Sequence, residues 1–425
     1  MSSRKLSLLI GASLSALMAA PAGAETLQEA IASAFQTNPA LQIERYRTDI
    51  ARENLDLARS AGRPQVNLSA SGGYEYVDTN SLLNFGTGDR PIASAQLQAS
   101  QPIYTGGRIS AGIRRAEAGI DAADKSFDAA TQDLILDVVT AYVNVRRDRE
   151  AVAIRRNNVD VTGEQVRAAE DRFEVGVVTL TDVAQAKARL EGARAALAGA
   201  EAALVGSEAF YQFLTGLMPG VLEAPPPVPP LPASLQAATE EGLANNPSIE
   251  AARQQLRAAG AGVDAAKAEG RPQVSLVGTA GVQETWGDSS RRDTNVSAVA
   301  QGRIPLFTGG AVKAQVNAAK LQREQARRQV DALETQVRAQ IAQAWFGYEA
   351  ALRAIEASKR QVEAAEIAYE GAKEELAVGV RTTLDVLDQE QQLFEARLSL
   401  VAAERDAYVA AHQLLRATGS LGTGG

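Results

Sequence analysis

The chain has 425 residues, 45% of them apolar, a formal net charge of −8, no cysteine and a single histidine, His412. The acidic balance argues against nucleic acid as a partner, because phosphate binding needs a basic surface, and the absence of cysteine excludes disulfides, thiolate metal sites, a cysteine nucleophile and a lipid-modified N-terminal cysteine. Since the one histidine is interpreted as structural or exposed, we expect no enzymatic activity, no cofactor and no metal site.

The first 24 residues have the pattern of a secretory signal peptide. Arg4 and Lys5 supply a positive start, residues 6–20 are apolar, and Ala22-Gly23-Ala24 fits a cleavage site. The alternative is an N-terminal helix buried in the fold. Cleavage would leave a mature chain that begins near Glu25, with a net charge of about −10. No other apolar run reaches the length of about 18 residues that a membrane-spanning helix needs, so we expect an exported chain without a helical anchor.

An alanine-rich helical segment is predicted over residues 27–61. We expect it to end before Gly62-Arg63-Pro64, because glycine and proline both stop a helix. Beyond it the apolar period changes from 3.6 to 2. Apolar and polar residues alternate over 66–76 and 93–100, which predicts two strands. A weaker alternation over 274–283 and 294–303 predicts two more.

These four strands have the length of about 10–12 residues that a tilted strand needs to cross a bilayer. Tyr74, Tyr76 and Trp286 lie near strand ends and suit an aromatic girdle, while residues 78–90 and 285–293 are predicted polar loops. Four strands cannot close a barrel, and open edges are not tolerated in lipid. Three copies would together supply twelve strands, an even number in the range of outer-membrane barrels. The alternative is a surface sheet of a soluble protein.

A much longer helix is predicted from about residue 107 to 175. No proline occurs between Gly106 and Met218, and apolar residues recur every seven residues from Val138 to Phe173, which specifies a left-handed supercoil. Such a helix would extend on the order of 100 Å. Because its seam is rich in alanine and valine, we infer that it packs against further copies of the chain. The alternative is a soluble, fibrous coiled coil.

The whole pattern occurs twice. Gly62–Val66 recurs at Gly270–Val274, an offset of 208, and the later motifs recur at an offset of 203. We therefore divide the chain into a signal peptide (1–24), a first repeat (25–218), a proline-rich linker (219–233) and a second repeat (234–425). The second repeat would contain a helix over 235–269 and its own long helix. Return helices are predicted to start at Thr181-Asp182 and at Leu384-Asp385.

With these motifs in place, the sequence resembles the TolC-type outer-membrane channel family, which serves type I secretion systems and tripartite efflux pumps. The resemblance covers essentially the whole mature chain. It is carried by Asn38-Pro39, Gly62-Arg63-Pro64, Tyr104–Gly107, Phe307–Gly310 and, most specifically, Val378–Asp388.

The resemblance implies an α+β membrane protein of the outer membrane. Three copies would form a homotrimer whose 12-strand barrel, with four strands per chain, continues into an α-helical coiled-coil tunnel in the periplasm. Its partners would be a periplasmic adaptor, an inner-membrane transporter and outer-membrane lipid. The alternative function is an exported, non-conducting coiled-coil scaffold or adhesin.

Two carboxylates are candidates for a pore constriction. Asp385 and Asp388 are three residues apart near a helix start, so they share one helix face. The resemblance implies that they project inward at the closed periplasmic end, where six carboxylates of a trimer would select for cations. The alternative is that they only cap the helix.

The resemblance also assigns Arg381, Thr181 and Asp182 to contacts between neighbouring hairpins that latch the tunnel shut. The alternative is an exposed ion pair of little energetic consequence. Leu376 stands where some family members have a hydrogen-bonding aromatic residue, so the latch would have fewer parts here. Gly176 and Gly379, at the hairpin tips, would allow close approach by the adaptor, or serve simply as turn residues.

Overall fold

The computed structural model describes residues 24–77, 88–287 and 290–422. The signal peptide predicted over residues 1–24 lies outside them except for Ala24, as does most of the loop predicted over 78–90. The chain forms two compact units, each built from both repeats. The hairpin unit consists of residues 24–37, 138–227 and 364–401, and the strand unit of residues 38–137, 228–363 and 402–422.

The two shorter helical segments are each divided in two. The expectation of single helices over 27–61 and 235–269 is wrong, because the chain forms α1 (Leu27–Thr37) and α2 (Pro39–Ser60), then α5 (Leu235–Asn245) and α6 (Pro247–Ala268). Asn38 and Asn246 have an extended backbone conformation, and the side chain of each accepts a hydrogen bond from a backbone N–H of the following helix. Proline follows as the first residue of that helix. It disfavours the helical conformation in the asparagine before it, so the helix stops and restarts.

The long helices are confirmed. Helix α3 (Arg108–Glu174) and helix α7 (Ala311–Ala377) have 67 residues each, and the return helices α4 (Leu180–Thr215) and α8 (Thr383–Thr418) have 36 each. These lengths are the same in both repeats, as expected of a duplication. Among the described residues, no helix combines the length and the apolar character that crossing a membrane requires.

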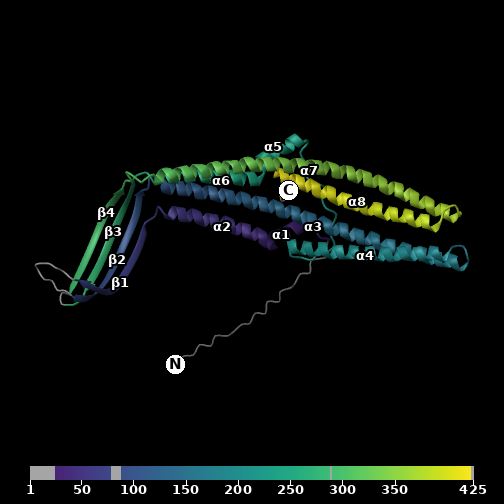
Figure 1. Ribbon diagram of the computed structural model, residues 1–425, viewed down its shortest axis with the longest axis horizontal. Helices are drawn as coiled ribbons and strands as arrows, with labels where there is room; N and C mark the ends of the chain where they lie inside the picture. Colours follow the sequence, from purple (N-terminus) through teal and green to yellow (C-terminus); the bar gives the residue numbers. More distant parts are fainter. Residues whose placement is uncertain (1–23, 78–87, 288–289, 423–425) are drawn as a thin grey trace, which may run out of the picture. The chain divides into compact units, whose positions relative to one another are not determined.

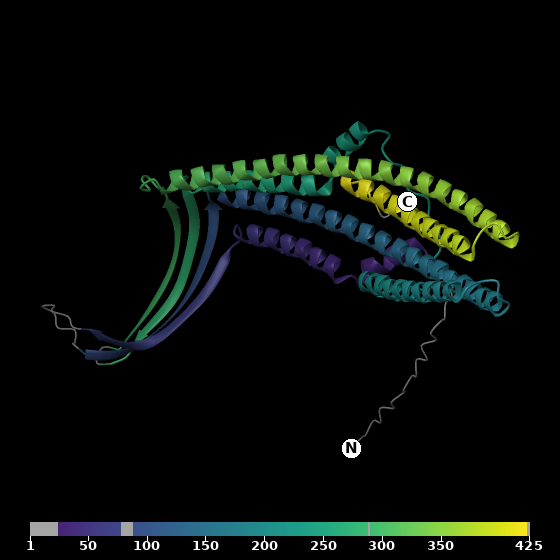
Figure 2. The ribbon, with the colours of Figure 1, turned by 45° about the vertical axis from the view of Figure 1, so that its right-hand side comes forward.

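The four predicted strands are confirmed and are longer than expected. They are β1 (Gln65–Val77), β2 (Gly88–Tyr104), β3 (Gln273–Thr285) and β4 (Arg291–Arg303), and they form one antiparallel sheet in the order β1-β2-β3-β4 (Figures 1 and 2). The pairing of β2 with β3 joins the two repeats in one sheet.

The register of the strands places apolar residues on one face of the sheet and polar residues on the other. Val66, Leu68 and Ala70 of β1 lie opposite Ala99, Leu97 and Ala95 of β2, and the apolar rows continue across β3 and β4. Successive strand residues point to opposite faces, so serine and threonine gather on the other face, where the hydroxyls of Ser71 and Ser94 are 2.8 Å apart and those of Thr279 and Ser297 are 2.7 Å apart.

The apolar face is largely exposed. Leu68, Tyr74 and Val296 on this face are 73%, 83% and 81% exposed. A sheet of this kind in a soluble domain would normally bury its apolar face against a second layer. The described residues of the strand unit provide no such cover for these side chains.

The helical part of the strand unit has its own core. Ala238 and Ile249 of α5 and α6 pack against Val337 and Ile341 of α7 and Leu414 of α8. His412 is buried here as well, where its Nδ1 lies 2.8 Å from the Tyr408 carbonyl oxygen and its ring lies against the tyrosine ring. Burial lowers the pKa of His412, so it is neutral at physiological pH. The structural interpretation of this histidine is confirmed.

In the hairpin unit, two buried tyrosines fix the first described residues. The Tyr142 hydroxyl lies 2.8 and 2.9 Å from the carbonyl oxygens of Glu25 and Glu223, and the Tyr211 hydroxyl donates to the Glu25 carboxylate at 2.6 Å. Along α3, the predicted seven-residue seam is buried at Val138, Val145, Val152 and Val166.

Candidate functional site

Two turns close the helical hairpins at the same end of the hairpin unit (Figures 1 and 2). Gly176 lies between α3 and α4 with a φ of 78°, and Gly379 lies between α7 and α8 with a φ of 79°. This left-handed conformation ends a helix and favours glycine. The space beside each glycine is open, since apart from its chain neighbours no heavy atom of the described residues lies within 4 Å of where a Cβ would stand.

Each tip presents exposed apolar side chains. Val175 and Val177 of the first tip are 73% and 71% exposed, and Val378 and Val380 of the second are 74% and 75% exposed. The turn chemistry therefore accounts for the glycines, while no described part of the chain buries the valines.

The helices that follow the tips begin with matching capping boxes. Asp182 accepts hydrogen bonds from the Thr179 N–H and hydroxyl, both at 2.8 Å, and Asp385 accepts the same pair from Thr382 at 3.0 and 2.7 Å. These bonds, above all those from the threonine N–H groups, lower the pKa of both carboxyls. Both aspartates therefore cap their helices and are ionised at neutral pH.

Asp388 has a different environment from Asp385. Arg189 of α4 donates to its Oδ1 and also reaches the Gln391 Oε1 at 3.5 Å, so this arginine joins the first hairpin to the second. Arg172 of α3 makes a second connection, donating to the Thr383 hydroxyl at 3.2 Å. The sequence analysis singled out neither arginine. The only available signal was that the acid at 388 has no counterpart in the first repeat, where Gln185 stands.

The residues predicted to form a latch are not in contact within one chain. Arg381 is paired with Glu375 of its own hairpin at 2.5 Å, and Asp182 is engaged in its capping box. Among the described residues, no hydrogen bond or ion pair joins Arg381 to Thr181 or Asp182. A latch built from these residues would need a neighbouring chain.

Metal binding was also considered. In residues 24–77, 88–287 and 290–422, no group of three or more histidine, aspartate or glutamate side chains is placed to hold a metal ion.

Comparisons with known proteins point in one direction. The family model described as outer membrane efflux protein matches residues 30–216 and 238–420. The chain is 34% identical to the outer membrane efflux protein BepC of Brucella suis biovar 1 over 93% of this chain and 86% of the relative. It is 28% identical to the outer membrane protein TolC of Escherichia coli K12, over 98% and 86%. The fold is similar to the crystal structure of the Campylobacter jejuni CmeC outer membrane channel, with a TM-score of 0.83, 19% identity, and coverage of 93% and 86%.

Proposed function

Because this chain belongs to the outer membrane efflux protein family, we propose that three copies of it assemble into the exit duct of a tripartite efflux pump or a type I secretion system. Membership places the protein in the outer membrane and makes it a channel through which an efflux or secretion system discharges its cargo. The proposal adds the trimer and two partners, an inner-membrane transporter and a periplasmic adaptor.

The observation that carries the trimer is the four-stranded sheet. It has an apolar face whose side chains are exposed, a polar face, and two outer strands, β1 and β4, each with an unpaired edge. Unpaired backbone groups are costly in lipid, so the sheet must be closed by strands from elsewhere. Three copies would join β4 of one chain to β1 of the next and close a barrel of twelve strands, with the apolar rows toward lipid and the serine-rich rows toward the lumen.

The constriction is assigned to the start of α8. In the trimer, Asp385 and Asp388 would contribute six carboxylates, which favours passage of cations. We expect Asp385→Ala combined with Asp388→Ala to weaken cation selectivity in planar bilayers, because the fixed negative charge is removed. Unchanged selectivity would take both residues out of the pore.

The latch is assigned to contacts between chains. Arg381 would reach Thr181 and Asp182 of a neighbouring copy, since Arg381 and Thr181 are exposed, Asp182 is half-buried, and no described hydrogen bond or ion pair joins Arg381 to them within one chain. Such charge-assisted contacts are broken by small rotations. Arg381→Ala is expected to raise the resting conductance, and a variant that stays as closed as the unaltered protein would contradict this assignment.

The hairpin tips are assigned to the adaptor. Gly176 and Gly379 leave open space, and the exposed valines beside them offer apolar contacts to the helical tips of a partner. We expect Gly379→Trp to weaken adaptor binding in a pull-down with purified adaptor, while the oligomer remains intact. Full binding by this variant would show that the adaptor contacts another surface.

The function as a whole is tested by purification in detergent followed by mass measurement and single-channel recording. We expect a stable trimer that conducts ions after insertion into a planar bilayer. A mature chain that remains monomeric and soluble without detergent, or a trimer that never conducts, would overturn the proposal.

A further inference from the structure

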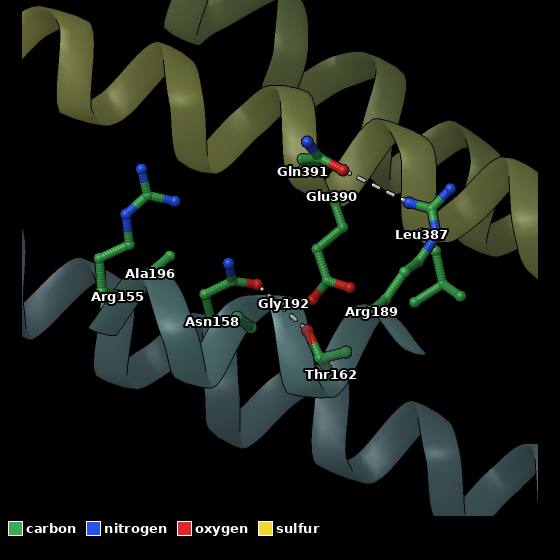
Figure 3. Close-up of a pocket in the computed structure, with 10 residues that line it drawn as sticks. Arg155, Asn158, Thr162, Arg189, Gly192, Ala196, Leu387, Glu390 and Gln391 are labelled. Carbon is green, nitrogen blue, oxygen red and sulfur yellow. Dashed lines mark hydrogen bonds between the residues drawn. The ribbon is translucent and has the colours of Figure 1, made fainter. Parts of the chain in front are cut away.

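A cavity of about 340 Å³ lies between the two helical hairpins of the hairpin unit (Figure 3). It is lined by α3, α4 and α8. Three of the lining residues on α4 are small, namely Gly192, Ala193 and Ala196. Apart from the backbone of α4 itself, no heavy atom of the described residues lies within 4 Å of where a Cβ on Gly192 would stand. The contact between the hairpins is therefore left unfilled at this level.

Glu390 of α8 extends into this space. The residue is only 3% exposed, and its Oε1 has no hydrogen-bond partner among the described residues. Figure 3 shows the side chain extending from α8 toward Thr162 of α3 and Gly192 of α4. Thr162 does not satisfy it, because the threonine hydroxyl donates to Asn158 at 3.1 Å. A buried carboxyl oxygen without a hydrogen-bond partner is unusual, because burial strongly disfavours the ionised form of the group when its charge is not compensated.

The duplication shows that this arrangement is specific to the second repeat. At the offset of 203, the counterpart of Glu390 is Lys187, which forms an ion pair with Glu170 at 2.7 Å. The counterpart of Glu170 is Lys373, so the second repeat contains the same pair with reversed charges. That pair is not formed, because Lys373 pairs instead with Glu370 at 3.6 Å and lies over the Tyr369 ring.

The charged and titratable groups that face Glu390 come from all four helices. Arg155 of α3 lies at one end of the cavity and Arg189 of α4 at the other, with Glu390 between them (Figure 3). Arg189 is already paired with Asp388 of α8. Tyr369 of α7 is close enough for Glu390 to help raise the pKa of its hydroxyl, after burial as the main cause.

Within the described part of the chain, no cation forms an ion pair with Glu390, and burial raises the pKa of its carboxyl to about 7. At neutral pH the protonated and ionised forms are both populated. An ionised Glu390 would be hydrated if the hairpins moved apart, and its pKa would return toward the ordinary value of about 4.3.

We propose that Glu390 and its cavity form a proton-operated contact between the two hairpins, which holds them together when the carboxyl is neutral and releases them when it ionises. This inference rests on the proposed function, because it concerns how the helical end of the channel opens. Asp385 of the proposed constriction does not serve this purpose, since its capping bonds lower the pKa of its carboxyl and keep it ionised.

The direction of the pH effect follows from linkage. The packed state of the hairpins binds the proton on Glu390 more tightly than the separated state, so low pH favours packing. The free energy that favours packing decreases as the pH rises from about 4.5 to about 7, and above that range it no longer changes with pH. For one chain, the ratio of separated to packed hairpins is expected to increase on the order of 50-fold between pH 5 and pH 8. The carboxyl of Asp385 has a lowered pKa and does not titrate in this window.

The test uses the full chain in detergent and in planar bilayers. Spin labels at Ala195→Cys on α4 and Gln392→Cys on α8, both exposed positions, report the separation of the hairpins, and the chain has no other cysteine to interfere. We expect the population with the longer distance to grow between pH 5 and pH 8, and the open probability to grow with it. Glu390→Gln, which cannot ionise, should abolish both responses. Glu404→Gln, at an exposed glutamate of the same helix, should leave both unchanged.

Equal pH responses in the unaltered protein and in Glu390→Gln would overturn the inference. So would spin-label distances that do not change with pH in the unaltered protein, a result that decides the question even if Glu390→Gln does not fold. A protein that never conducts at any pH would instead contradict the proposed function, while the spin-label distances would still report on the contact itself.

Discussion

The contact between Arg189 and Asp388 gives the sharpest test of how the two hairpins are held together. We consider Arg189→Gln, which removes the charge and keeps a polar but shorter side chain. In the protein, Arg189 donates to Asp388 and approaches Gln391 at 3.5 Å, so one side chain of α4 holds two of α8. The substitution leaves both helices intact, because neither partner lies on the helix that carries the arginine.

The free energy that the Arg189–Asp388 ion pair contributes follows from how exposed its two side chains are. The side chains of Arg189 and Asp388 are 29% and 48% exposed, so solvent screens the interaction and it contributes about 0.5–1 kcal/mol. In the proposed trimer three such contacts would act together, about 1.5–3 kcal/mol in all. If the hairpins move in concert, the ratio of open to closed channels should rise roughly 10- to 100-fold. Freeing the Asp388 carboxylate should also increase cation selectivity.

Single-channel recording measures both quantities in one experiment. The matched control is Arg194→Gln on the same helix, because Arg194 pairs at 2.6 Å with Glu191 one turn before it and does not reach α8. That variant should behave like the unaltered protein. Equal open probabilities for Arg189→Gln and Arg194→Gln would refute the idea that the contact between α4 and α8 holds the channel closed.

Three further predictions use other positions. Asp385→Asn and Asp182→Asn should lower thermal stability alike, because the two capping boxes match, but only Asp385→Asn should reduce cation selectivity in planar bilayers. Gly419→Ala should cost more stability in thermal unfolding than Gly379→Ala. Both glycines have φ near +78°, which costs alanine about 1–2 kcal/mol, but a Cβ at Gly419 would also lie 2.7 Å from a backbone oxygen, adding about 1–3 kcal/mol. Tyr211→Phe should cost about 1.5–3 kcal/mol in the same assay, by removing a buried hydrogen bond to a carboxylate; an unchanged midpoint would contradict it.

Most of the fold was accessible from periodicity. The change from a period of 3.6 to a period of 2 located all four strands, and the absence of proline after Gly106 predicted the long helix that the structure has from Arg108 to Glu174. These signals are local and repeated, so they do not depend on which parts of the chain meet in space. The register of the sheet also follows from them, since pairing apolar rows with apolar rows leaves few alternatives.

The helix breaks were missed because a short local preference overrode the longer pattern. Alanine-rich periodicity runs without interruption through Asn38-Pro39, but the asparagine side chain caps the next helix and proline disfavours a helical conformation in the residue before it. Asn246-Pro247 repeats the same break for the same reason.

The candidate site was only partly accessible from the sequence. The capping role of Asp385 is one of the two alternatives that the sequence predicts, because a carboxylate near the start of a helix is a local signal. The contacts of Arg189 and Glu390 depend on which face of α4 packs against α8, and no local sequence pattern specifies that face. The position of Glu390 opposite three small residues of α4 emerges only when two helices separated by about two hundred residues pack together.

The two repeats have kept the same turns and changed the contacts between them. Both tips have a glycine with φ near +78° followed by a threonine–aspartate capping box, so the shape of the hairpins is duplicated. The contacts are not duplicated. Arg189 of the first hairpin faces Asp388 and the cavity of Glu390 in the second, while the first hairpin has glutamine and a paired lysine at the matching places. Among the described residues of the two hairpins, the buried acid without a partner, Glu390, belongs to the α7–α8 hairpin, and Asp388 of the same hairpin is held by Arg189. A change in proton or salt concentration therefore acts on that hairpin and leaves the α3–α4 hairpin as the fixed support. Opening of the helical end should therefore begin with displacement of α7 and α8.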